Sequence, residues 1–425
     1  MSLSESKSLT LFPETVSLLE QPNSLDAIKA PKFHSVEEKR AYLKKMYSGE
    51  VPWPYMNGGM GIDFSDDNFC SAVIEEGGIA TLAASFVGAV EIQKQLRDGT
   101  KRSFEEKVTL AGDLNAAKLR QEIKNVREKN PYAILAVNLM LALGGFDEML
   151  KVCGESGEVD MVMVGAGVSK DLPKKMLDYP NMDYVLIVTD SDKPEKLNRI
   201  AATVGGKMPV AYYEELPGAG GHLGADADAD DERYQPKRII SEIRNAGVTT
   251  PIILAGGNLN RNNVREAYEM GANGVAFGTL LLLTKESGLP DHLILKYYLD
   301  EAYKVVRART SPSGLPSRYI DHPEFHEYVS NKDIFKETKQ LCSNCIKQIR
   351  CKFFTDTKLS DKYIPGETSY CIARHLERTR SGHEDGLFFV GEIINEIRKD
   401  MARFTGEDGL IRVPTIKETL EYSFR

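Results

Sequence analysis

The sequence predicts an α/β fold: a (β/α)8 barrel with an N-terminal extension and a helical, cysteine-containing C-terminal appendage. Two observations lead to this prediction. Short apolar runs alternate with longer amphipathic stretches between residues 51 and 285, which is typical of parallel βαβ units. Glycine and small polar residues follow these runs, as they do at the mouth of a barrel, where active sites are built.

The apolar runs are the expected strands. Each run has the length of a buried strand and is followed by glycine or polar residues. In chain order the expected strands are Pro54–Met56, Ile79–Ala83, Ile134–Val137, Met161–Val164, Val185–Val188, Pro209–Tyr212, Ile252–Ala255 and Gly274–Phe277.

Helices are expected between these strands. Residues 114–129 place Ile123 on the face opposite Lys124, and residues 237–246 and 262–270 show similar amphipathic patterns. Strands that alternate with such helices favour a parallel sheet, and eight units fit a closed barrel better than an open sheet.

The chain divides into three predicted segments. Residues 1–50 form the N-terminal extension, residues 51–285 the barrel and residues 286–425 the helical appendage. Within the appendage, Leu293–Arg309 is expected to be a helix, and a last helix is expected around Gly391–Phe404.

Composition and charge exclude several classes of protein. With 42% hydrophobic and 27% charged residues the chain is globular, and its net charge of -8 argues against nucleic-acid binding. No apolar run approaches the ~18 residues of a membrane span. The N-terminus does not resemble a secretory signal, and six cysteines in 425 residues do not make a disulfide scaffold. The cytoplasm is therefore the expected compartment.

Glycines at the ends of the last strands predict an anion site. Gly256-Gly257 and Gly278-Thr279 follow two successive strands, and Gly220-Gly221 follows the strand before them. Glycine lets backbone N–H groups approach a phosphate closely, and the last two loops of such barrels commonly hold one. A single pair is explained as well by strand termination; three pairs on neighbouring strands favour the anion site.

His222 follows the glycines Gly220 and Gly221 on the same predicted loop. Histidine is the side chain best suited to proton transfer near neutral pH, so His222 is the candidate base. The alternative is a loop histidine that only bonds the backbone.

Two other binding motifs are disfavoured. Leu223 replaces the last glycine of a dinucleotide fingerprint, and no Walker A motif occurs. The acidic tract 226–232 begins like a calcium loop, but Asp231 and the later residue Lys237 stand where such a loop needs glycine and glutamate. We therefore interpret the tract as a solvated loop near the barrel mouth.

Four cysteines of the appendage are candidate metal ligands: Cys342, Cys345, Cys351 and Cys371. The first two have a C-x2-C spacing, and four thiolates hold zinc or an iron–sulfur cluster in other proteins. The later spacings match no zinc pattern, so reduced thiols that pack a small subdomain are the alternative. Cys70 and Cys153 are expected in the core.

At this point the motifs resemble a known family. Residues 57–61 (NGGMG), 219–224 (AGGHLG), 255–257 (AGG) and 278–279 (GT) resemble the nitronate monooxygenase family, formerly 2-nitropropane dioxygenases. The same FMN-dependent barrel superfamily includes flavin enoyl-acyl-carrier-protein reductases. The resemblance covers residues 50–285, and the segment 342–391 resembles the C-terminal extension of a bacterial subgroup.

The resemblance implies FMN at the barrel mouth. It implies that Gly58, Gly59 and Met60 lie along the isoalloxazine ring, that Asn138 lies within hydrogen-bonding reach of it, and that His222 is the catalytic base. The phosphate would be held by Gly220, Gly221, Gly256, Gly257, Gly278 and Thr279.

Three functions stay open. The first is a nitronate monooxygenase that oxidises nitronates or nitroalkanes with O2. The second is an NAD(P)H-dependent enoyl-thioester reductase, and only this alternative implies acyl carrier protein as a partner. The third is a flavin-binding redox module without turnover. A small-molecule substrate is expected under the first two, and a homodimer is compatible with all three. The polar segment 211–217 departs from the family pattern and puts the substrate in doubt more than the cofactor.

Overall fold

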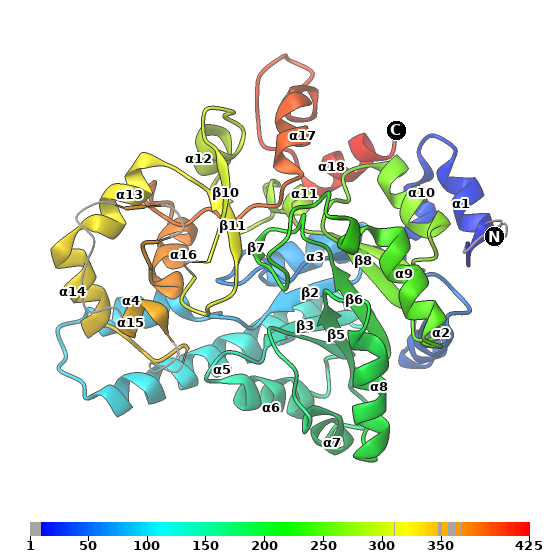
Figure 1. Ribbon diagram of the computed structural model, residues 1–425, viewed down its shortest axis with the longest axis horizontal. Coiled ribbons are helices and arrows are strands. Elements are labelled where there is room, and N and C mark those ends of the chain that lie inside the picture. The colour runs from blue at the N-terminus through cyan, green and yellow to red at the C-terminus, as the bar shows by residue number, and fades with distance from the viewer. Residues whose placement is uncertain (1–9, 310, 347–350, 356–362, 365–366) are drawn as a thin grey trace.

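Eight parallel strands form the centre of the computed structural model, which describes residues 10–425 except 310, 347–350, 356–362 and 365–366 (Figure 1). The barrel strands are β1 (Met56–Asn57), β2 (Ala80–Ala83), β3 (Leu135–Met140), β4 (Met161–Gly165), β5 (Asp183–Val188), β6 (Ala211–Glu215), β8 (Ile252–Ala255) and β9 (Gly274–Phe277). All of the predicted strands are confirmed, with ends shifted by up to three residues.

The strands are hydrogen-bonded in the order β1-β9-β8-β6-β5-β4-β3-β2. The barrel is closed between its first two strands by a bridge from Met56 to Ile79. The side chain of Asn57 completes the closure, because it donates to the Thr81 carbonyl at 2.9 Å and accepts from the Thr81 N–H at 2.8 Å. The (β/α)8 barrel predicted from the sequence is therefore confirmed.

Helices follow the strands and cover the outside of the barrel. Those from the N-terminus to β9 are α1 (Pro13–Leu19), α2 (Val36–Ser48), α3 (Asp67–Glu75), α4 (Ala89–Leu96), α5 (Phe104–Lys129), α6 (Phe146–Ser156), α7 (Leu172–Lys175), α8 (Lys193–Thr203), α9 (Pro236–Asn245) and α10 (Arg261–Glu269). Local sequence fixes where several of them begin. Ser103 and Glu106 form a capping box at α5, and the Asn260 side chain caps α10.

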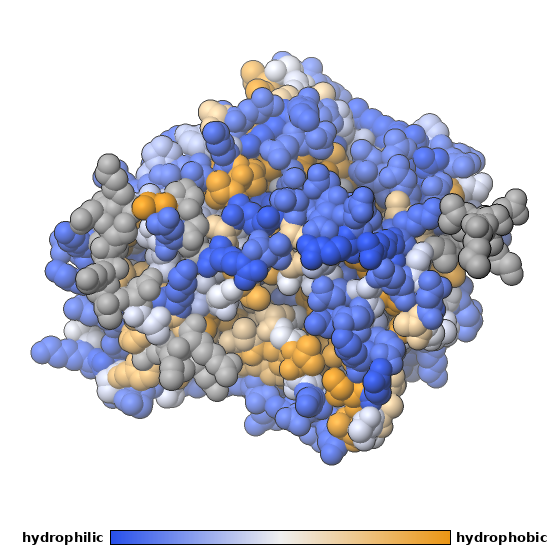
Figure 2. Space-filling model, viewed as in Figure 1, coloured by the Kyte–Doolittle hydropathy of each residue, from blue (hydrophilic) through white to orange (hydrophobic). Residues whose placement is uncertain are grey.

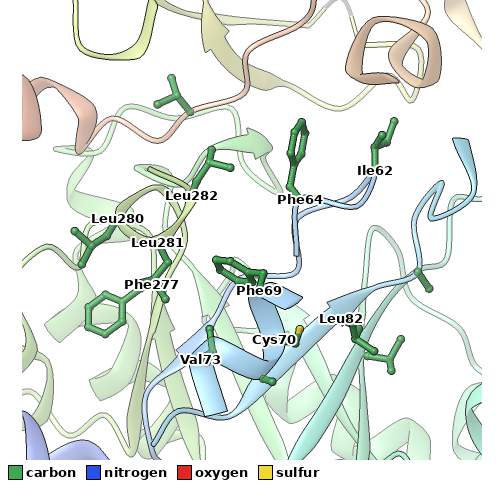
Figure 3. Packing of buried hydrophobic residues seen from close by; sticks show 14 of the residues in the cluster. Ile62, Phe64, Phe69, Cys70, Val73, Leu82, Phe277, Leu280, Leu281 and Leu282 are labelled. Atoms are coloured by element: carbon green, nitrogen blue, oxygen red, sulfur yellow. The ribbon is translucent and has the colours of Figure 1, made fainter. Parts of the chain in front are cut away.

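Apolar side chains fill two layers. The inner layer lies inside the barrel, where Met163, Val185 and Ile253 pack with Trp53 and with Met46 of α2. The outer layer lies between the strands and the helices. Figure 3 shows part of it, with Phe69, Cys70 and Val73 of α3 lying between Leu82 of β2 and Phe277 of β9. Cys70 and Cys153 are buried as predicted.

After β9 the chain forms the elements α11 (Thr279–Leu282), α12 (Asp291–Leu293), β10 (Val305–Ala308), β11 (Ser317–Ile320), α13 (Pro323–Ser330), α14 (Lys332–Gln340), α15 (Lys352–Thr355), α16 (Ile372–Arg380), α17 (Ile394–Lys399) and α18 (Ile416–Ser423). In Figure 1 helices α13 to α16 lie together at one side of the barrel, away from the N-terminus.

The predicted helix Leu293–Arg309 is wrong over its second half. The helical stretch ends at Tyr298, and β10 begins at Val305. Strands β10 and β11 are antiparallel, and β11 also pairs with the short strand β7 (Gly221–His222), which lies in the loop after β6. This pairing overrides the local helical pattern because the hydrogen-bond partners of the backbone lie far away in the sequence. Around Gly391–Phe404 the structure has α17 and a 3-10 turn at Met401–Phe404, so the helix expected there is found in part.

Within the described residues, no helix is both long enough and apolar enough to cross a membrane.

Candidate active site

All of the predicted site residues meet at one cavity of about 600 Å³ at the carboxyl ends of the strands. The cavity is lined by His222, Gly58, Gly59, Met60, Asn138, Gly220, Gly221, Gly256, Gly257, Gly278 and Thr279. These residues come from the ends of β1, β3, β6, β8 and β9, which the fold brings to one mouth.

The loops after β1 and β3 touch directly. The loop after β1 begins at Gly58, whose N–H donates to the Phe277 carbonyl at 3.0 Å. A Cβ atom on Gly59 would lie 2.3 Å from Cβ of Asn138, so only glycine lets the two backbones come this close. Asn138 itself is 8% exposed and donates to the Met163 carbonyl at 3.3 Å.

The loops after β6 and β8 are also in contact. Gly256 has φ +92° and Gly257 φ +125°, conformations that favour glycine. A Cβ atom on Gly256 would lie 2.9 Å from the Leu216 carbonyl oxygen. Asn258, which the sequence analysis missed, fixes this loop because its side chain donates to the carbonyls of Leu254 and Ala276.

Two glycines leave open space in the cavity wall. A Cβ atom added to Gly257 or to Gly278 would meet no heavy atom within 4 Å. Since both residues line the cavity, their backbones face its interior and are open to a bound group. This arrangement suits an anion that approaches backbone N–H groups closely.

A segment of the appendage completes the mouth. The N–H of Gly391 donates to Oγ1 of Thr279 at 2.7 Å, and the N–H of Glu392 donates to the Gly218 carbonyl at 2.9 Å. A Cβ atom on Gly220 would lie 2.5 Å from the nitrogen of Gly391. The loops after β6 and β9 therefore meet through residues more than a hundred positions later in the chain, which the sequence analysis did not place in the site.

Arg318 of β11 stabilises the loop after β6 through hydrogen bonds. Its guanidinium donates to the Pro217 carbonyl at 2.6 Å and to the Ala219 carbonyl at 2.5 Å, and it pairs with Glu392 at 3.2 Å. Arg318 is 4% exposed; its Nη1 atom donates to both carbonyls and its Nη2 atom contacts Glu392, so the two arms of the guanidinium serve different partners. Nothing in the local sequence marked this residue as a support of the site.

His222 lies at the edge of β7 with its ring in the cavity wall. Its Nε2 atom is 2.5 Å from Oγ of Ser311, and its ring centroid is 5.5 Å from that of Phe389. Burial lowers the pKa of His222 to about 4, so the ring is neutral near neutral pH. Neither Ser311 nor Phe389 was predicted, because each reaches His222 only through the tertiary fold.

The polar end of β6 places a second titratable group in the cavity. Glu215 lines the cavity, and burial raises its pKa to about 8. Its neighbour Glu214 is fully buried on the other side of the strand. Burial, and to a smaller extent the charge of Asp190, raises its pKa to about 8 as well. Both carboxyl groups therefore keep their protons at neutral pH.

The acidic tract after His222 is attached to the hairpin of the appendage. Asp226 pairs with Arg307 at 3.2 Å and with Arg309 at 2.5 Å, and Asp228 pairs with Arg307 at 2.8 Å. The tract is largely exposed, as the solvated loop predicted from the sequence would be, and ion pairs hold its start.

The four cysteines of the appendage form no disulfide bond in the part of the chain that the structure describes. Burial raises the pKa of Cys345 well above its usual range, and the neighbouring thiol of Cys371 raises it further. In the part of the chain that the structure describes, no group of three or more His, Cys, Asp or Glu residues could hold a metal ion. The expectation of zinc or an iron–sulfur cluster at Cys342, Cys345, Cys351 and Cys371 is therefore not supported.

Comparison with known proteins places this cavity in a family. The nitronate monooxygenase family model matches residues 44–399. Among solved structures, FabK from Thermotoga maritima is similar with a TM-score of 0.55 and 19% identity, covering 90% of this chain and 94% of that chain. A nitroalkane oxidase from Streptomyces ansochromogenes is similar with a TM-score of 0.53 and 17% identity, covering 82% of this chain and 92% of that chain.

Among curated proteins, the tryptophan synthase alpha chain of Helicobacter pylori is 26% identical over 224 residues, which cover 50% of this chain and 80% of that protein. The two solved structures share the fold with this chain. The family match extends over most of the sequence and includes every loop of the cavity described above, so this chain belongs to the nitronate monooxygenase family of FMN-dependent oxidoreductases.

Proposed function

We propose that this chain is a nitronate monooxygenase that binds FMN in the cavity and oxidises alkyl nitronates with O2 to a carbonyl compound and nitrite. The observation that carries the proposal is the single cavity in which glycine loops and His222 meet. Its volume of about 600 Å³ is within the usual range for sites that bind small molecules and cofactors.

The residues of the mouth fit a phosphate-bearing flavin. Gly257 and Gly278 face open space, and Gly256 and Gly257 have backbone conformations that favour glycine. We assign the phosphate to these loops together with Gly220, Gly221 and Thr279, and the isoalloxazine ring to Gly58, Gly59, Met60 and Asn138. When bound, FMN supplies the redox chemistry, and the protein supplies position and electrostatics.

We assign His222 the role of the group that meets the reacting end of the substrate. A neutral imidazole accepts a proton, but a pKa of about 4 makes the charged form unfavourable while the site is empty of anions. A nitronate carries its own negative charge, which favours the protonated ring, and it needs no removal of a C–H proton. The pKa therefore favours nitronates over neutral nitroalkanes as substrates.

The test is to measure oxygen consumption and nitrite release by the FMN-loaded protein with propyl nitronate. We expect both, and slower but measurable turnover of the neutral nitropropane. NADH consumption with crotonyl thioester in the absence of any nitronate reaction would instead identify an enoyl-thioester reductase. Bound FMN with no turnover of either substrate would identify a redox module.

A further inference from the structure

The cavity extends beyond the glycine loops into the layer between the barrel and its helices. This extension, here called the apolar branch, is lined by Leu172 and Pro173 of α7, Leu186 and Val188 of β5, and Leu197 and Ile200 of α8. In a strand, alternate residues face opposite sides, so Leu186 and Val188 face the helices while Ile187 faces the barrel interior. The cavity therefore crosses the end of β5 and continues on its outer face.

The packing in the apolar branch is incomplete. Leu186 of β5 and Ile200 of α8 are partly exposed, although both pack against the outer layer between the strands and the helices. In a filled layer such side chains are close-packed. Figure 2 shows apolar side chains gathered on the surface in the region of α7 and α8. Val168, which lines the same cavity, is 56% exposed. Apolar walls that stay uncovered favour an apolar occupant.

The apolar branch is continuous with the reacting centre. A Cβ atom on Gly224 would lie 2.3 Å from Cγ2 of Thr189, so the loop that carries His222 touches the residue that follows β5. Both Thr189 and His222 line the same cavity. Asp190 and Lys193, which form an ion pair at 3.5 Å, also line this cavity. A molecule that reaches His222 can therefore extend an apolar part along β5.

We propose that the apolar branch binds the alkyl chain of the substrate, whose reacting end lies at His222; this deepens the proposed function and rests on it. The occupant is an extended aliphatic chain with a small polar head. Along α8, Lys193 to Ile200 spans about 10 Å. An alkyl chain that advances about 1.25 Å per bond would fill this length with roughly eight carbons. The substrate class is then a medium-chain nitronate, in preference to the shortest members.

The first test is kinetic. For ethyl, butyl, hexyl and octyl nitronates we expect kcat/KM to rise about two- to fourfold per added methylene, as burial of each CH2 predicts. Ile200→Trp fills the apolar branch and should lower the ratio of octyl to ethyl kcat/KM by at least about tenfold. Ile200→Ala, which introduces no bulk, should reduce the gain per methylene. Leu410→Trp is the control, because Leu410 is 67% exposed and lies outside the cavity.

The second test measures binding without turnover. We expect octanoate to bind the purified protein, as measured by isothermal titration calorimetry, and Ile200→Trp but not Leu410→Trp to weaken this binding about tenfold or more. Binding that is unaffected by Ile200→Trp, or a flat chain-length profile in an active enzyme, overturns the inference. If the unaltered protein turns over no nitronate but binds the fatty acid specifically, the proposed reaction is rejected and the apolar branch remains a site for alkyl chains.

Discussion

The Nε2 atom of His222 lies 2.5 Å from the Oγ atom of Ser311, and this contact joins the loop after β6 to the segment between β10 and β11. Ser311 is fully buried, and its Oγ is also 2.9 Å from Oγ of Ser313, which lines the cavity. A histidine with one ring nitrogen held by a buried hydroxyl keeps one ring orientation. Ser311 is therefore a positioning residue for the proposed base.

Removal of this hydroxyl should lower turnover and leave substrate binding intact. Loss of one hydrogen bond of about 1–1.5 kcal/mol predicts a fall in kcat of about tenfold for Ser311→Ala with little change in KM. Ser311→Thr keeps the hydroxyl and should restore most of the activity. Ser48→Ala, at an exposed helix end, is the control. A parallel rise in KM, or no rescue by threonine, would argue against a positioning role.

Replacement of His222 by asparagine should separate the two kinds of substrate. His222→Asn is expected to keep FMN but to lose turnover of neutral nitroalkanes by about 10²-fold or more, because proton transfer by a positioned side chain contributes at least that much. Turnover of nitronates should fall less, since these substrates are already deprotonated. Oxygen consumption with nitropropane and propyl nitronate measures both effects. Unchanged nitroalkane turnover would remove the assignment of His222 as base.

The contact between Gly59 and Asn138 should not tolerate a methyl group. Gly59→Ala would place a Cβ atom 2.3 Å from Cβ of Asn138, so the loop after β1 must shift. Overpacking of this kind costs about 1–3 kcal/mol, and we expect a lower melting temperature and reduced FMN content. Gly145→Ala is the matched control, because a Cβ atom there meets nothing within 4 Å. Equal melting temperatures and FMN contents in the two variants would show that the loop after β1 can shift without cost.

Arg318 should be replaceable by neither lysine nor an apolar residue without loss of cofactor. Arg318→Lys keeps the charge but not the fork, in which Nη1 binds the carbonyls of Pro217 and Ala219 while Nη2 binds Glu392. Loss of one such bond corresponds to a roughly tenfold weaker FMN affinity, measured by titration of the apoprotein. Arg120→Lys, on the exposed face of α5, should bind FMN like the unaltered protein. An unaltered affinity in Arg318→Lys would mean that the loop does not depend on the fork.

The carboxyl groups at the end of β6 predict that stability falls as the pH rises from acid toward about 8. The pKa of Glu214 is raised to about 8 in the folded state, so its contribution is full below the unfolded pKa near 4.3 and is lost as the pH rises toward 8. We expect the melting temperature to fall between about pH 4 and about pH 8, and Glu214→Gln to reduce this fall. Glu105→Gln, at the exposed start of α5, is the control. A pH profile that is the same in Glu214→Gln would contradict the assignment.

Much of the fold and of the barrel mouth was predictable from the sequence, because the patterns that mark the strands are local. Strands such as Met161–Gly165 are short, apolar and bounded by glycine, and a parallel barrel brings their ends together by topology alone. That is why Gly59, Asn138 and His222 line one cavity although they lie far apart in the chain.

What the sequence did not show depends on pairing over long distances. Val305–Ala308 is a strand only because β11 lies beside it, and β11 in turn pairs with Gly221–His222. Gly391 reaches Thr279 across 112 positions, and no window around either residue contains that contact. For the cysteines the sequence left two interpretations open, and the spacing of Cys342 and Cys345 is not accompanied by a metal-binding arrangement in the described part of the chain.

The visible absorption spectrum of the purified protein, followed by quantification of released FMN, tests the central claim most directly. We predict flavin bands and equimolar FMN in the unaltered protein. Gly278→Val should show strongly reduced FMN, because its side chain would occupy cavity space that no protein atom fills. Absence of flavin from the unaltered protein even after incubation with FMN, or full FMN content in Gly278→Val, would contradict the account.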